Sequence, residues 1–287
     1  MSLSFVLQLI ISGFLTGGVY SLIALGLSLI FGVMRIINFA HGEMMVWGMY
    51  IAYTLLIWTG IDPFVSLVAS AGVLFVLGYV FQRMVVNRII EFPEAMQVIP
   101  MIGAALIFEN GARLIWGPDF RSPSSRFSLS SIWIGQIMID VPRLLAFLIA
   151  ILISALVFLF LKHTDIGKTI RSAADNRLGA LLVGADVNQV YAVCFGVGMA
   201  CTGAAGALLV PLTPLAPHIG PPFTMVSFII VILGGMGSLM GAMIGGLIVG
   251  VAESVATLFL PSSLKQIVSF SLMVLILLFR PKGLFGR

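Results

Sequence analysis

Three polar side chains that can bind a solute or exchange protons lie close together near residue 40. Asn38, His41 and Glu43 supply an amide, an imidazole and a carboxylate, and they interrupt an apolar run over residues 5–58. A charged side chain at the centre of a bilayer is costly, so such residues usually face a cavity or a binding partner. Their position within an apolar run therefore predicts a polar path for a solute through a membrane protein.

The chemistry of these side chains leaves two interpretations open. His41 either contacts a solute or is a neutral imidazole held by hydrogen bonds inside the protein. Glu43 either lies on the path or caps or pairs within the chain. Gly42 weakens the helix between them, so that backbone groups can turn towards the path.

The composition indicates a membrane protein. Of the 287 residues, 60% are hydrophobic and 9% are charged, whereas an ordinary soluble domain has about 25% charged residues. We predict an all-α polytopic membrane protein in which residues 1–287 form a single transmembrane domain. Because the first cation is Arg35, the first apolar run is not expected to be a cleaved signal peptide.

The apolar runs predict eight or nine membrane spans, some of them short or broken. The run over residues 224–233 is too short to cross about 30 Å of hydrocarbon as a helix unless its flanks extend it. The runs lie at residues 5–31, 38–58, 64–81, 98–116, 142–161, 188–210, 224–233, 239–260 and 264–279.

Basic residues predict the orientation, because cytoplasmic loops carry an excess of Lys and Arg. With three basic groups inside, the loops 117–141 and 211–223 lie outside. The first loop is expected to be solvent-exposed, and the prolines of the second are expected to make it stiff. The three groups are Arg83 and Arg88; Lys162, Lys168, Arg171 and Arg177; and Arg280, Lys282 and Arg287.

A basic stretch over residues 162–187, the cytoplasmic segment, also carries an apolar stripe. The stripe recurs at spacings of three and four residues, which predicts an amphipathic helix. Such a helix must bury its apolar face against the membrane surface, against the rest of the chain, or in a groove of a soluble partner. Its members are Ile170, Ala174, Leu178, Leu181 and Leu182.

Glycines near the C-terminus recur at four-residue spacing, as Gly237, Gly241 and Gly245 illustrate. Small residues at this spacing let helix backbones approach closely in lipid, so tight helix packing is the favoured interpretation. The cluster over residues 234–237 is also expected to break a helix and to expose backbone groups to a cavity.

Further ionisable residues lie within apolar runs. Glu109 and Arg113 are four residues apart, so they are predicted to pair on one helix face. Glu253 has no partner of this kind, and it is expected to meet either the stretch 38–43 or a neighbouring subunit. The sequence carries no metalloprotease motif, no Cys and His cluster for a metal, and no phosphate loop. We therefore expect no enzyme activity, no metal and no nucleic-acid partner.

Several motifs, in the same order, closely resemble the permease subunits of branched-chain amino acid ABC importers, the LivH type. The stretch 18–53 contains the most recognisable string, INFAHGE at residues 37–43. The resemblance continues through GKTIRSAADN at 167–176, LVGA at 182–185, ILGGMGS at 232–238, GAMIGGL at 241–247 and RPKGLFGR at 280–287. It covers essentially the full length. The EAA-x-x-x-G loop of the other large importer class is not reproduced.

This resemblance implies a subunit of the bacterial inner membrane that moves a solute by alternating access. The implied partners are a second homologous permease, two cytoplasmic ATPases that bind ATP and Mg²⁺, and a periplasmic binding protein, with no cofactor on this chain. The implied path residues are Asn38, Phe39, His41, Glu43, Gly234, Gly235 and Gly237. The cytoplasmic segment becomes a coupling helix, with Gly167, Lys168, Arg171, Ala174, Asp175, Asn176, Leu178, Leu182 and Gly184 as the residues implied to dock on an ATPase.

Members of the resembled family import branched-chain and other neutral amino acids, and relatives take urea, short amides or aromatic acids. A rival interpretation is a gradient-driven transporter or channel that works alone, with Glu43, His41 and Glu109 as ion sites. A third is a scaffold that only positions other subunits. Flux through the isolated chain in liposomes separates the rival from the importer, and substitution of Asn38 by Leu tests the scaffold.

Overall fold

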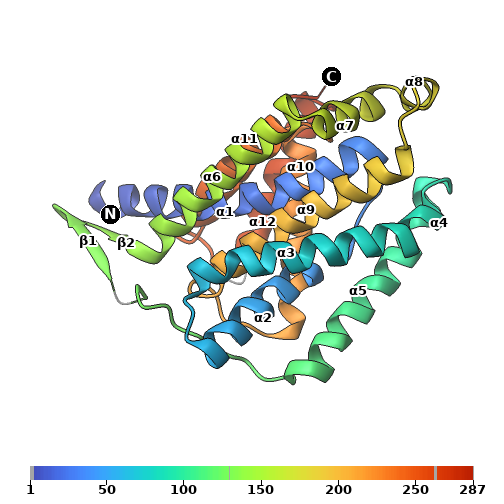
Figure 1. Cartoon of the computed structure of the whole chain (residues 1–287). Helices are drawn as coiled ribbons and strands as arrows, with labels where there is room; N and C mark the ends of the chain where they lie inside the picture. Colours follow the sequence, from blue (N-terminus) through green and yellow to red (C-terminus); the bar gives the residue numbers. More distant parts are fainter. Residues whose placement is uncertain (1–2, 129, 262–263, 287) are drawn as a thin grey trace.

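The computed structural model describes residues 3–128, 130–261 and 264–286. Arg287, a member of the predicted C-terminal basic group, lies outside these ranges. The described chain forms a bundle of helices with one short β-hairpin (Figure 1). The helices are α1 (Leu3–Met34), α2 (His41–Thr59), α3 (Pro63–Phe81), α4 (Asn87–Ile89), α5 (Glu94–Trp116), α6 (Val141–His163), α7 (Asp165–Asp175), α8 (Arg177–Leu182), α9 (Val187–Leu209), α10 (Gly220–Gly234), α11 (Leu239–Ala256) and α12 (Lys265–Phe279). The antiparallel strands are β1 (Ser131–Ile134) and β2 (Ile137–Asp140).

Within the described ranges, seven helical segments are long and apolar enough to cross a membrane. α2 has the length but begins with polar residues, and α12 is apolar but has 15 residues. These two helices account for the difference from the eight or nine spans expected. The short run at 224–233 is extended by its N-terminal flank into a segment of 18 residues, Pro217–Gly234. The all-α polytopic prediction is confirmed.

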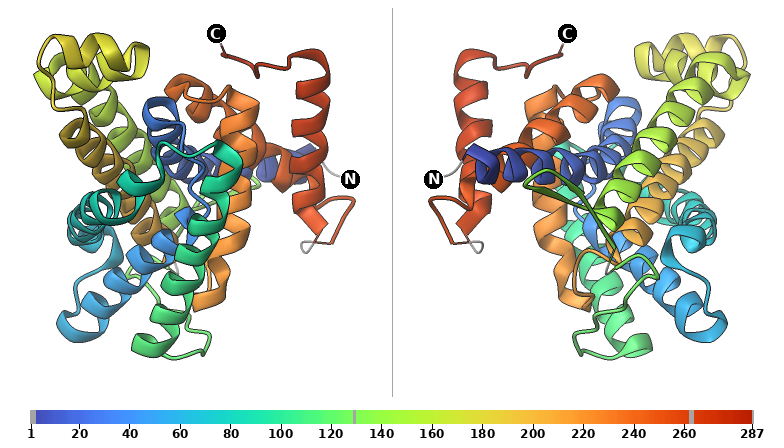
Figure 2. Two further views of the ribbon diagram at one scale, coloured as in Figure 1. Left: turned by 90° about the vertical axis from the view of Figure 1, so that its right-hand side faces the viewer. Right: turned by 90° about the vertical axis from the view of Figure 1, so that its left-hand side faces the viewer.

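Two helices, α1 and α9, form the centre of the bundle. Residues 17–30 of α1 and 201–209 of α9 are buried throughout. Hydrophobicity does not drive helices together in lipid, so close van der Waals packing between small residues must do it. The predicted glycine contacts are confirmed, since Gly250 of α11 packs against the backbone of Gly17 in α1. In Figure 2, α12 stands at the edge of the bundle, beside α10 and α11.

The predicted basic groups gather at one end of the bundle. α8 and α4 lie at this end, and the β1–β2 hairpin lies with the N-terminus at the opposite end (Figure 1). Arg177 of α8 forms an ion pair of 3.4 Å with Glu91, which follows α4. The C-terminal tail approaches the same end, where Gly286 contacts Gly235 beyond the end of α10. The arrangement agrees with the orientation that the Lys and Arg distribution predicts.

Both predicted outer loops contain regular structure that the sequence interpretation missed. In the first, β-branched residues flank Gly135, whose φ of +62° allows the tight turn of the β-hairpin. In the second, Pro221 and Pro222 lie in the first turn of α10, where a missing backbone N–H costs nothing. The proline-rich loop is therefore partly the beginning of a helix.

Candidate functional site

The turn between α1 and α2 is largely buried, with Arg35 as its exposed residue. α1 ends at Met34, and α2 begins at His41. Asn38 has no exposed surface, and its side-chain oxygen accepts a hydrogen bond from the Ala40 backbone N–H at 3.1 Å. This contact closes a local turn of the kind that Asn favours. The predicted second span begins at Asn38, whereas in the structure this residue lies outside the helix.

His41 joins three helices. Its Nε2 atom lies 3.0 Å from the carbonyl oxygen of Ile23 in α1 and 3.2 Å from Oγ1 of Thr202 in α9. The imidazole is fully buried. This geometry corresponds to the hydrogen-bonded histidine that the sequence left as one of two interpretations. Nδ1 of His41 and Nδ2 of Asn38 have no partner among the described residues.

Glu43 and Gly42 connect the start of α2 to α10. Oγ1 of Thr224 accepts a hydrogen bond from the Gly42 N–H at 2.9 Å and lies 3.4 Å from the Glu43 carboxylate. A Cβ atom at Gly42 would lie 2.1 Å from the carbonyl oxygen of Gly220. Gly42 is therefore required for close approach of the two helices rather than for flexibility. Glu43 is almost fully buried and bonded within the chain.

Phe39 lines an apolar cavity of about 310 Å³. Its ring packs against Phe228 of α10, with ring centroids 5.2 Å apart. Met236, from the break between α10 and α11, lines the same cavity. The wall is completed by apolar side chains of α1, α10, α12 and the turn before α2: Leu27, Phe31, Ile37, Met225, Ile229, Val231, Ile232, Phe270 and Met273.

The glycine cluster breaks the helix where predicted. α10 ends at Gly234, and Gly235 and Gly237 have φ values of +100° and +83°, a conformation that favours glycine. The carbonyl oxygen of Gly234 accepts a hydrogen bond from Phe285 in the C-terminal tail at 3.0 Å. The tail thus forms a hydrogen bond with a backbone group that was predicted to face a cavity. The assignment of this break and of residues 38–43 to a solute path stays a prediction.

The predictions for the ionisable residues within the spans have different outcomes. The predicted pair between Glu109 and Arg113 is confirmed, at 2.6 Å. Glu253 does not meet the stretch 38–43, which was one of the two partners expected for it, and contact with a neighbouring subunit stays a prediction. Its carboxylate lies 3.2 Å from the Tyr20 hydroxyl of α1 and 3.4 Å from Lys265 Nζ of α12. These partners lie on other helices, so residue spacing within α11 could not reveal them.

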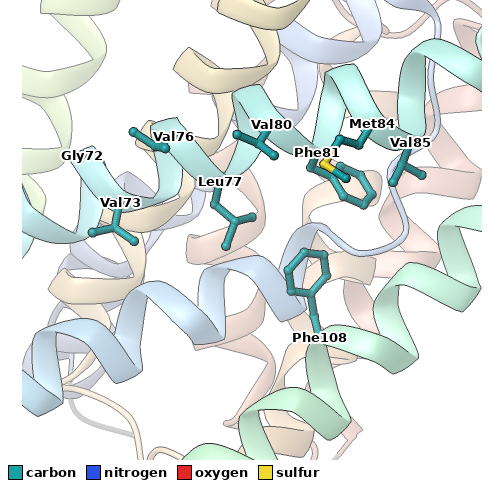
Figure 3. A pocket seen from close by; sticks show the side chains of 9 residues that line it. All are labelled: Gly72, Val73, Val76, Leu77, Val80, Phe81, Met84, Val85 and Phe108. Carbon is teal, nitrogen blue, oxygen red and sulfur yellow. The ribbon is translucent and has the colours of Figure 1, made fainter.

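A wide apolar groove runs between α3 and α5, with a volume of about 670 Å³. Figure 3 shows Val73, Leu77 and Phe81 of α3 along one wall and Phe108 of α5 on the other. None of the predicted path residues lines it. Its apolar walls are those expected of a surface that faces lipid.

The cytoplasmic segment is two helices rather than one. Asn176 is extended, with φ −152° and ψ 99°, and its side chain accepts a hydrogen bond from the Gly179 N–H at 2.9 Å, which caps α8. The single amphipathic helix that we predicted is therefore interrupted at Asn176. Asn is a strong N-cap residue, which explains why a new helix begins there.

The apolar stripe divides between the two helices. Ile170 of α7 is buried within the chain, and Gly167 lets α7 approach the end of α6 closely. Ala174 is exposed at the end of α7, as is Leu178 on α8. Leu182 is 88% exposed and lies beside two further exposed apolar residues, Leu181 and Val183.

The polar residues of the cytoplasmic segment are mostly exposed. Lys168 pairs with Asp165 at 2.9 Å, and this cation lowers the pKa of the Asp165 carboxyl. Arg171 contacts the Lys162 carbonyl oxygen at 3.5 Å, and Asp175 is exposed at the end of α7. Gly184 ends α8 with φ +83°. Most of the predicted docking residues are therefore exposed, whereas Gly167 is buried against α6 and Asn176 caps α8. Their contact with an ATPase stays a prediction.

The family model described as branched-chain amino acid transport system / permease component matches residues 9–277. The chain belongs to this family. It is 32% identical to the high-affinity branched-chain amino acid transport system permease protein BraD of Pseudomonas aeruginosa, over 98% of this chain and 96% of that protein. It is 31% identical to the LivH permease proteins of Salmonella typhimurium and Escherichia coli, with the same coverage. No solved structure matches the chain significantly.

Membership in this permease family and the seven apolar helices identify a multi-pass protein of the bacterial inner membrane. The chain is a transport permease of the class found in ABC importers. Among the residues that the structure describes, no group of three His, Cys, Asp or Glu side chains could hold a metal ion.

Proposed function

We propose that this chain is the membrane-spanning permease subunit of an ATP-driven importer for branched-chain or related neutral amino acids. The observation that carries the proposal is the match to branched-chain amino acid permeases over 98% of this chain. The surface of α8 supports it, because Leu178, Leu181 and Leu182 are exposed where a soluble partner can cover them.

The partners that complete this importer are a second homologous permease, two cytoplasmic ATPases and a periplasmic binding protein. ATP and Mg²⁺ bind to the ATPases, and this chain contributes no catalytic group. Its own part is to form half of the translocation path and to receive the motion of an ATPase.

The proposed mechanism is alternating access. Closure of the ATPases moves α8 and α7, and α7 transmits this motion to the bundle because Ile170 and Gly167 pack against it. The predicted path passes the turn 38–43 and the break at residues 234–237. Two features support this position: Phe39 and Met236 line one cavity, and buried nitrogens of Asn38 and His41 have no partner within the described residues. Buried groups of this kind are where water or a ligand commonly binds.

Reconstitution tests the proposal. The complete importer in proteoliposomes should take up leucine only when ATP and binding protein are present. Substitution of Arg171 or Asp175 by Ala should reduce uptake while the chain still inserts and assembles. Full uptake by such variants would contradict the coupling role. Proton-driven uptake by the isolated chain would favour the rival gradient-driven transporter.

A further inference from the structure

A small cavity of about 140 Å³, lined mainly by residues with polar groups, lies between α1, α6, α11 and α12. Three charged side chains from different helices line it: Arg143 of α6, Glu253 of α11 and Lys265 of α12. The larger cavity at Phe39 and the groove between α3 and α5 are lined by apolar residues and glycine. Arg143 and Lys265 lie in the first turns of their helices and are partly exposed, whereas Glu253 is buried. A buried charge in a membrane domain is costly and usually marks a functional site.

Hydrogen bonds from neighbouring helices hold the Glu253 side chain in place in this cavity. This side chain is 4% exposed. One carboxylate oxygen accepts a hydrogen bond from Ser269 at 2.8 Å, and the other accepts one from Tyr20 at 3.2 Å and lies 3.4 Å from Lys265 Nζ. A carboxylate can accept about four hydrogen bonds. Three positions are filled, so the carboxylate can accept one further donor from the cavity.

The two cations retain unused donors. Lys265 has three N–H groups and is only partly covered, with a side chain that is 39% exposed. Arg143 contacts Ser12 and, at 3.3 Å, Asp140 through one end of its guanidinium group. The remaining donors of both residues suit a carboxylate, with which they form charge-assisted hydrogen bonds.

A hydroxyl group of the wall supplies a further acceptor. Thr16 donates to the Ser12 carbonyl oxygen at 3.0 Å. Because the hydroxyl proton is used in this way, the lone pairs of this oxygen remain for a donor in the cavity. Together with Glu253, Thr16 suits an ammonium group.

We propose that this cavity binds the zwitterionic head group of an α-amino acid, with its carboxylate at Lys265 and Arg143 and its ammonium group at Glu253. The inference rests on the proposed function and deepens it by assigning a solute contact to this chain. Residues 38–43 do not take part.

The apolar cavity of Phe39 is a separate space further along the same helices. Leu27 lies two turns beyond Tyr20 on α1, and Leu27 and Met273 of α12 line that cavity, which shares no residue with the cavity at Glu253. Two helical turns rise about 10 Å, which is longer than the side chain of leucine, so the contacts to the head group alone carry this proposal.

Thiol protection tests the site without relying on transport. Thr257→Cys places an exposed thiol on the cavity wall, and Thr59→Cys is the matched control at the end of α2, because both threonines are exposed and donate to the backbone of their own helix. The native Cys194 and Cys201 are buried. The assembled importer, without binding protein, is treated with a small anionic thiol reagent in lipid nanodiscs.

Leucine should slow labelling of the Thr257→Cys variant by about tenfold when it is present at about ten times its Kd, and it should leave labelling of the Thr59→Cys variant unchanged. Leucinamide, which lacks the carboxylate, and 4-methylpentanoate, which lacks the ammonium group, should protect much less. Lys265→Met and Glu253→Gln should each abolish protection, whereas Glu109→Gln, which removes a carboxylate from the pair on α5, should not.

Lys265→Met keeps the test valid if Glu253→Gln fails to fold, because Lys265 is partly exposed. Absence of protection by leucine in a complex that shows ATP-driven leucine uptake would overturn this inference and leave the proposed function standing. Absence of uptake in the wild-type complex would overturn the proposed function itself. A labelling rate that follows added phospholipid and not leucine would assign the cavity to a lipid head group and overturn the proposal.

Discussion

The turn at residues 38–43 buries polar side chains, whereas helix α8 exposes apolar ones. The turn places Asn38, His41 and Glu43 inside the membrane domain, where hydrogen bonds from other helices hold two of them. α8 presents Leu178 and Leu182 to the outside. A buried polar group must find partners within the fold, whereas an exposed apolar surface is typical of an interaction site.

This difference separates two kinds of functional residue. Substitutions in the turn should alter the stability of the chain itself, because its partners are in the same chain. Substitutions on α8 should leave the chain folded and alter its assembly with another protein. Four substitutions test this separation, in order of decreasing effect.

Gly42→Ala should disturb the chain most. The new Cβ atom would lie 2.1 Å from the Gly220 carbonyl oxygen and 2.8 Å from the Thr224 backbone nitrogen. Overpacking typically costs about 1–3 kcal/mol, and rigid backbone atoms place this site at the upper end. Thermal unfolding of the purified chain, followed by size-exclusion chromatography, measures the loss. Gly103→Ala on α5 is the control, since its Cβ would contact nothing within 4 Å. Equal stability of both variants would contradict the packing role.

Leu182→Glu should leave unfolding unchanged to within about 0.5 kcal/mol. Its affinity for the ATPase subunits should fall by about tenfold, or about 1.4 kcal/mol, because a charge would enter an apolar contact. Titration of the purified permease with ATPase measures the binding. Leu182→Ile keeps the apolar surface and should bind normally. Unaltered binding by Leu182→Glu would remove α8 from the interface.

Thr202→Val should destabilise the chain by about 1 kcal/mol, since it removes a hydroxyl that contacts His41 without changing the side-chain shape greatly. His41 would keep its contact with the Ile23 carbonyl oxygen. Chemical denaturation measures the change. Ser28→Ala is the control, because the buried Ser28 hydroxyl has no partner among the described residues. A larger loss in the control would show that hydrogen bonds at His41 do not decide stability there.

Asn176→Ala should affect the whole chain least. Loss of the cap on α8 costs about 0.5–1 kcal/mol, and the loss should remain local because α8 is largely exposed. Hydrogen exchange should become faster at the amides of Gly179 and Ala180, while exchange in α9 is unchanged. Asn176→Asp keeps the accepting oxygen and should restore protection. Uniform acceleration across the bundle would mean that α8 is not an independent unit.

Elements that depend on residues close together in the sequence were predictable from the amino-acid sequence alone. Long apolar runs must form helices in lipid, because only helices satisfy their own backbone hydrogen bonds there, and the bounds of α3, α6 and α9 lie within two residues of those expected. The four-residue spacing of Glu109 and Arg113 was sufficient to predict their pair. The hairpin around Gly135 was missed, although its alternating β-branched residues and glycine are a recognised turn pattern.

Contacts between distant groups depended on how the helices pack. Thr202 and Ile23 reach His41, and Tyr20 and Lys265 reach Glu253, from other helices. In an apolar bundle almost every helix face is hydrophobic, so the sequence pattern does not reveal which face turns inward. Close contacts between small residues fix that choice, and these contacts place the few polar groups against one another.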